Sequence, residues 1–83
     1  MEVQLAVMTP KGEEILFDLC DSELELEKMT VLQMTNKIAE KLQIDNLRIV
    51  YRTKPLEEDK LVGSYGIQHL SVVQTVLMLP GGF

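Results

Sequence analysis

The sequence contains few of the residues that form covalent cross-links, metal sites or nucleophilic active sites. Among 83 residues there is one cysteine, Cys20, one histidine, His69, and no tryptophan. A single cysteine excludes an intramolecular disulfide and a cysteine-rich zinc site, and it favours a reducing compartment. A Cys20–His69 dyad is the one catalytic alternative. We favour instead a small hydrophobic cysteine at a strand end and a loop histidine, and we expect no enzymatic activity, metal or cofactor.

Basic residues and long hydrophobic runs are also scarce. Lysine and arginine number 8 against 13 aspartates and glutamates, which gives a net charge of −5. This balance argues against partners such as nucleic acid or an anionic membrane. No apolar run approaches the roughly 20 residues of a membrane span, and the start of the chain lacks the basic residues of a signal peptide. With 46 % hydrophobic residues, the chain is expected to form one small globular domain.

Alternating apolar residues predict the strands. Period-two patterns occur over residues 2–7, 15–19 and 47–52, and a last apolar strand is predicted over residues 72–79. The first two strands are separated by a Thr9–Gly12 turn and form a hairpin. We expect residues 53–55 to be a turn and residues 61–67 to be a compact loop with one helical turn.

One helix is predicted over residues 30–42. Thr30 and Gln33 form a capping box at its start. An apolar stripe follows at Val31, Met34, Ile38 and Leu42, while Thr35 and the charged residues face outward. The acidic segment 21–28 is expected to be a solvated loop, since it lacks the ligand spacing of a calcium loop. The order of elements predicts an α+β domain with one helix packed across a mixed sheet.

The face of the sheet opposite the helix is a candidate binding surface. On this face Val50 lies between Arg48 and Arg52 in the third strand, and Val76 and Met78 lie in the last strand. If the two strands are neighbours, these residues form an apolar patch with an arginine rim, which is typical of a partner site. The alternative is a scatter of single apolar residues, which is common on protein surfaces.

The chain ends with Pro80-Gly81-Gly82-Phe83, for which no regular structure is expected. Consecutive glycines make a narrow peptide that can thread a channel to an active site, or they make a simple linker. The sequence RIVYRTKPLEEDKLVGSYGIQ, residues 48–68, resembles ubiquitin and the ubiquitin-like proteins. The ending VLMLPGG is similar to the final strand and diglycine tail of that family.

This resemblance covers nearly the whole chain and implies the β-grasp fold, with a mixed sheet of four to five strands. It implies a domain over residues 1–79 and a flexible diglycine tail over residues 80–83. By resemblance, Lys54 matches a chain-linkage lysine. The family's partner-binding patch corresponds here to Arg48, Val50, Gln74, Val76, Met78 and Pro10.

In conjugated family members, an ATP-using enzyme adenylates the C-terminal glycine, which then passes to a cysteine thioester and finally to a lysine. By resemblance Gly82, preceded by Gly81, would be that glycine after a processing protease removes Phe83. The partners would be activating, conjugating and ligating enzymes or ubiquitin receptors. The resemblance implies a monomer located in the cytoplasm or the nucleus.

Two departures support another function. Met78 and Pro80 stand where ubiquitin has arginines in its tail. The alternative is a non-conjugated adaptor domain at the N-terminus of a larger protein, where it would recruit ubiquitin-pathway or proteasome partners. A sulfur carrier shares the fold, but its glycine must be terminal, and Phe83 argues against that function.

Overall fold

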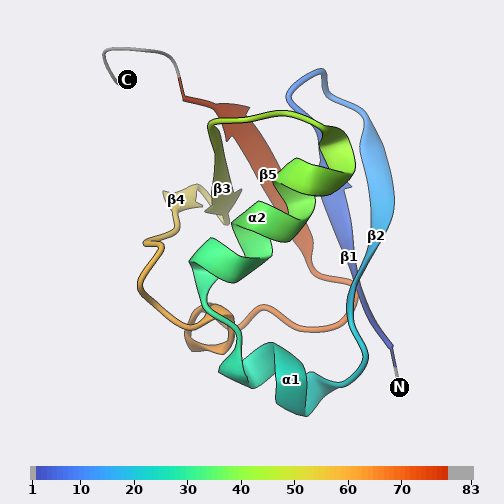
Figure 1. Cartoon of the computed structure of the whole chain (residues 1–83), viewed down its shortest axis with the longest axis vertical. Coiled ribbons are helices and arrows are strands. Elements are labelled where there is room, and N and C mark those ends of the chain that lie inside the picture. The colour runs from blue at the N-terminus through green and yellow to red at the C-terminus, as the bar shows by residue number, and fades with distance from the viewer. Residues whose placement is uncertain (1, 79–83) are drawn as a thin grey trace.

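The apolar residues near the two ends of the chain form two neighbouring interior strands of one sheet. The computed structural model describes residues 2–78 (Figure 1). The elements are β1 (Val3–Met8), β2 (Glu14–Cys20), α1 (Glu23–Lys28), α2 (Val31–Leu42), β3 (Leu47–Tyr51), β4 (Lys54–Pro55), the 3₁₀ helix η1 (Val62–Tyr65) and β5 (Val72–Leu77).

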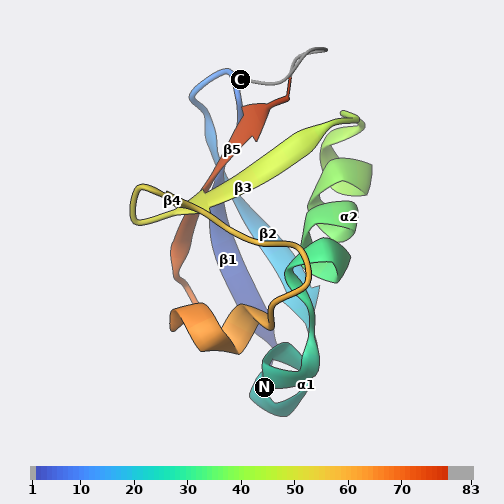
Figure 2. The same cartoon turned by 90° about the vertical axis from the view of Figure 1, so that its left-hand side faces the viewer.

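The sheet is mixed, with strand order β2-β1-β5-β3-β4. β1 and β5 run parallel, with Val7 opposite Val73, whereas the β1–β2, β3–β5 and β3–β4 pairs are antiparallel. α2 lies across one face of this sheet (Figure 2). The arrangement confirms the predicted α+β class and is that of a β-grasp fold.

Helix α2 confirms the predicted capping box. The Thr30 hydroxyl accepts a hydrogen bond from the Gln33 backbone N–H at 3.1 Å, and the Gln33 side chain accepts one from the Thr30 backbone N–H at 2.9 Å. Val31, Met34 and Ile38 are buried as predicted. The outward placement of Thr35 is wrong, because this residue is buried and its hydroxyl donates to the Val31 carbonyl at 2.8 Å. That bond satisfies the hydroxyl within the helix.

The loop predicted over residues 21–28 is wrong, because the segment contains helix α1. The Ser22 hydroxyl caps the helix by accepting a hydrogen bond from the Glu25 backbone N–H at 3.1 Å. Leu26 is buried in the core. α1 packs beside η1 at one end of the molecule (Figure 1). The cap and one buried leucine therefore anchor a helix of only six residues.

The turn after β3 also differs from the prediction. Arg52 and Thr53 have φ values of 51° and 67°, so the two-residue turn lies one position earlier and has left-handed backbone at both positions. Lys54 and Pro55 then pair with β3 as the edge strand β4. β5 ends at Leu77, before the predicted end at Leu79, which lies outside the described residues.

Replacement of Ile38 by alanine tests the packing of α2 on the sheet. Ile38 is 1 % exposed, so we expect Ile38→Ala to lower the free energy of unfolding by about 2–5 kcal/mol. Leu32→Ala, on the solvent side of the same helix, serves as the control and is expected to cost less than about 1 kcal/mol. Denaturant unfolding measures both, and equal losses would contradict this packing.

Candidate functional site

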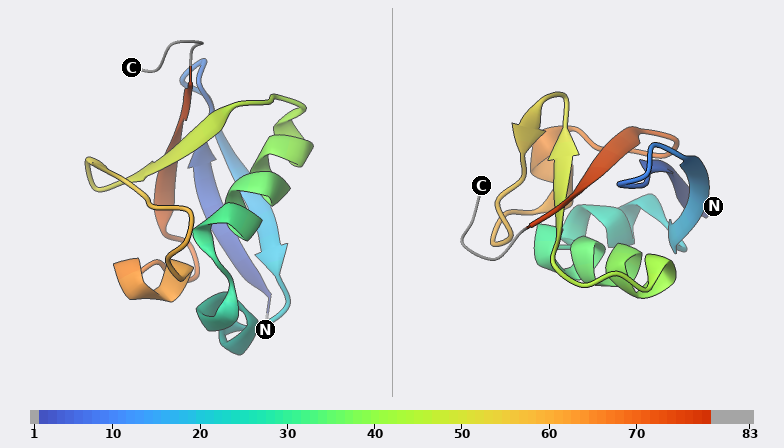
Figure 3. Two further views of the ribbon diagram at one scale, coloured as in Figure 1. Left: turned by 60° about the vertical axis from the view of Figure 1, so that its left-hand side comes forward. Right: turned by 90° about the horizontal axis from the view of Figure 1, so that it is seen from above.

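Strand pairing brings four side chains together on the face of the sheet opposite α2. Arg48 on β3 pairs with Val76 on β5, and Val50 on β3 pairs with Pro55 on β4. These four residues line an open hollow of about 380 Å³ whose lining is almost entirely apolar. The views in Figure 3 show α2 on the other side of the sheet. The hollow is therefore open and apolar, and it can accept an apolar side chain.

Positive charge lies at the edge of this hollow. The Nε atom of Arg48 is buried, and it has no hydrogen-bond partner among residues 2–78. The predicted rim position of Arg52 is wrong, because this residue lies in the turn after β3 and lines a different hollow with His69 and Val72. Its guanidinium carbon is 5.3 Å from the centre of the Tyr51 ring, which is within the range of a cation–π contact. An apolar centre beside the positive charge of Arg48 favours a ligand group that has an apolar side chain next to a carboxylate.

The structure brings together only part of the predicted patch. Arg48, Val50 and Val76 meet at the hollow, and Gln74 is exposed beside Val50. Pro10 lies in the turn between β1 and β2 and does not line the hollow. Met78 follows β5, donates its backbone N–H to the Asn46 carbonyl at 2.7 Å and lines a different hollow with Leu47 and Leu56.

Pro55 is the lining residue that the sequence analysis missed. The sequence predicts a turn at this position, whereas Pro55 lies in an edge strand, where proline is tolerated because its missing N–H faces away from the ladder. Lys54, the predicted linkage lysine, is exposed on the same short strand. Gly81, Gly82 and Phe83 lie outside the described residues.

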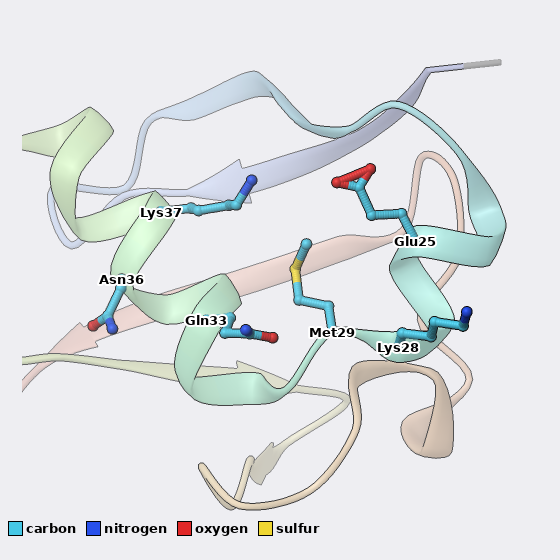
Figure 4. A pocket seen from close by; sticks show the side chains of 6 residues that line it. All are labelled: Glu25, Lys28, Met29, Gln33, Asn36 and Lys37. Carbon is cyan, nitrogen blue, oxygen red and sulfur yellow. The ribbon is translucent and has the colours of Figure 1, made fainter.

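Helix α1 creates a second hollow that the sequence did not predict. It has a volume of about 450 Å³ and is lined by side chains from both helices and the residue between them, namely Glu25, Lys28, Met29, Gln33, Asn36 and Lys37. Figure 4 shows Met29 projecting into the space between Lys37 and Glu25. Lys37 donates to the Leu19 carbonyl at 3.2 Å. The mixed charges and wide opening give this hollow no convergent set of ligand groups.

Cys20 and His69 each bond to the backbone of another residue. The Cys20 thiol donates to the Ser22 carbonyl at 3.3 Å, and the His69 Nδ1 atom accepts from the Gln4 backbone N–H at 3.0 Å. Within residues 2–78, no group of three or more histidine, cysteine, aspartate or glutamate side chains is placed to hold a metal ion. The same part of the chain has no helix of the length and hydrophobicity that a membrane span requires.

Burial raises the pKa of the Cys20 thiol, and the nearby carboxylates of Glu25 and Asp21 act in the same direction. The thiolate is the reactive form, so less of it is present at a given pH than for an ordinary cysteine. We expect iodoacetamide to alkylate the folded chain at least about tenfold more slowly than the chain in denaturant at pH 8. The alkylation rate of the folded chain should still increase with pH above the pH range in which an ordinary cysteine thiol titrates. Equal rates in the folded and denatured states, measured by mass spectrometry, would contradict this burial.

One comparison with known proteins bears on the surface. A family model described as "Ubiquitin family" matches residues 11–80. The match includes β2 to β5, and with them all four residues that line the hollow on the uncovered face.

Proposed function

The chain belongs to the ubiquitin family, and from this membership we propose that it is a protein modifier conjugated through Gly82. Partners would recognise it through the hollow lined by Arg48, Val50, Pro55 and Val76. That hollow is the observation that carries the recognition part of the proposal. It combines an apolar floor with a charged edge, as the centre of a protein interface does.

The strands that form the hollow are part of the sheet, which supports recognition without rearrangement. Val50 and Val76 are held by antiparallel pairing of β3 with β5, and the adjoining residues Ile49 and Thr75 are buried. A partner that fills the hollow therefore does not have to order a loop first, which would cost conformational entropy. Burial of apolar surface contributes about 25 cal/mol per Å², so a small hollow of this kind supports a modest affinity.

The tail supports the conjugation part of the proposal by composition. Cleavage after Gly82 would expose its carboxylate. In the chemistry implied by the family, this carboxylate attacks the α-phosphate of ATP and pyrophosphate leaves. A cysteine thiolate of the activating enzyme then displaces AMP to form a thioester. Finally a lysine amine displaces the thiol and an amide forms. The chain itself supplies the carboxylate and the recognition surface, and the enzymes supply the catalytic groups.

An adaptor domain that is not conjugated is the second candidate, and one observation favours it. Met78 lines a hollow with Leu47 and Leu56 and is an apolar residue where ubiquitin has an arginine. Pro80 also restricts the backbone close to the glycines. An activating enzyme that reads arginines at these two positions would find neither.

Deletion of the two glycines separates these functions. The full chain with an N-terminal tag should give a ladder of heavier bands on a denaturing, reducing immunoblot of cells that express it. A variant that lacks Gly81 and Gly82 should give only the unconjugated band, because no glycine carboxylate remains to be activated and transferred. A single band for both proteins would contradict the modifier and support the adaptor.

A double substitution tests the hollow. Val50→Ala with Val76→Ala removes apolar contacts at the centre of the surface, and we expect partner affinity to fall at least about tenfold. Leu24→Ala with Leu32→Ala removes two exposed leucines from the helices and is the matched control. Pull-down followed by titration with the purified partner measures both variants. Unchanged affinity in a double variant that remains folded would contradict recognition at this hollow.

A further inference from the structure

The same face of the sheet carries a second apolar feature at its opposite edge. Leu16 on β2 pairs with Ala6 on β1, and Ala6 pairs with Val72 on β5, so the three side chains form a row across three strands. Leu16 is 60 % exposed and Val72 is 50 % exposed. Leu16 therefore projects as a knob from the edge strand β2, and the hollow begins at Val76 on β5, two strands away.

Acidic residues flank this knob. Glu14 and Asp18 lie two positions to either side of Leu16, on the same face of β2, and both are exposed. Asp18 accepts a hydrogen bond from the Gln4 side chain at 2.6 Å, which leaves its second carboxylate oxygen for another donor. The β3 side of the face carries Arg48. The face is therefore acidic with a projecting leucine at one edge, and basic with a hollow at the other.

We propose that this face binds a second copy of the chain in a two-fold symmetric dimer. Leu16 of each copy would enter the hollow formed by Arg48, Val50, Pro55 and Val76 of the other copy. The two-fold axis would lie in the plane of the interface. It would pass above the sheet, over the boundary between β1 and β5. In this arrangement Glu14 approaches Arg48 of the second copy, and the row of Ala6 and Val72 lies under the contact.

Self-complementarity is the reason to choose a second copy over another partner. An isologous interface requires one surface to carry both halves of each contact, and it then forms every contact twice. Here the knob and the hollow, and the acidic and basic edges, occupy one face. Arg48 gives the edge of the hollow a positive charge, which attracts an acidic side chain of the other copy.

The dimer is expected to be weak and reversible. A stable interface buries about 800 Å² per partner, and one face of a sheet this small, with a shallow hollow, supplies at most about that area. The net charge of −5 on each copy also opposes association. A monomer therefore predominates at low concentration. The inference rests on the proposed function in one respect, because the dimer and a partner would use the same hollow.

Sedimentation of the full chain tests the dimer. We expect the mean mass to rise from monomer towards dimer between about 10 µM and about 1 mM, as for a dissociation constant in that range. Leu16→Asp should raise the dissociation constant at least about tenfold. Leu24→Asp, at a comparably exposed leucine on α1, is the control and should not change it. Circular dichroism checks that the variants fold, and Leu16→Ala gives a milder second variant.

A charge exchange tests the pairing of the edges. Glu14→Arg and Arg48→Glu should each weaken the dimer, and the two changes in one chain should restore it, because each variant side chain again faces an opposite charge. A wild-type chain that remains monomeric over the whole range overturns the proposal. So does a dimer that Leu16→Asp leaves unchanged, or a dimer that the double exchange fails to restore.

The two proposals fail in different ways. If the wild type stays monomeric while Val50→Ala with Val76→Ala still loses partner affinity, the dimer is wrong and the proposed recognition stands. If the dimer forms and responds to Leu16→Asp while the double alanine variant binds its partner normally, the recognition proposal is wrong and the dimer stands. Loss of partner binding by Leu16→Asp in a monomeric protein would assign the row to a partner and overturn the second copy.

Discussion

Parallel pairing of β1 with β5 is the constraint on which the rest of the structure depends. It joins the two ends of the described chain at the centre of the sheet, with Val7 opposite Val73 and both residues fully buried. The intervening segment must leave the sheet and return, and α2 occupies one face as it does so. Since β3 pairs with the other side of β5, Arg48 and Val76 meet only because β5 is in place. The hollow is thus a product of long-range topology, although each of its residues lies on an ordinary strand.

The sequence predicted the features that depend on interactions between residues close together in the chain. The Thr30–Gln33 box, the apolar stripe of α2 and the alternation of β1, β2 and β3 were all readable, because they depend on residues within a turn or two of one another. The uncovered face was predicted only on the condition that the third and last strands are neighbours. The pairing of Arg48 with Val76 satisfies that condition. Pro55 was missed because the turn before it uses Arg52 and Thr53 at positive φ, where asparagine and glycine are the usual signals.

Helix α1 shows why a short amphipathic segment can mislead. Leu24 and Leu26 alternate like strand residues, and six residues have too little intrinsic helicity to form an isolated helix. Tertiary contacts supply what the local sequence lacks. The Val62 backbone N–H donates to the Met29 carbonyl at 2.8 Å just after the helix, and the Val31 N–H donates to the Lys60 carbonyl at 2.8 Å. These bonds tie the segment after α1 to the loop around η1, and neither partner is visible from the acidic run itself.

The polarity of the uncovered face links its two proposed occupants. If the binding site is blocked in some of the molecules, the apparent affinity for the partner falls in proportion to the fraction that remains free. A weak dimer therefore leaves partner binding unaffected when the chain is dilute and lowers it where copies are concentrated. The same arginine selects both occupants, because the positive charge of Arg48 at the edge of the hollow favours a carboxylate beside an apolar side chain. Leu16 and Glu14 present that pair of groups on β2. A partner must therefore bind the hollow more tightly than Leu16 and Glu14 of a second copy do.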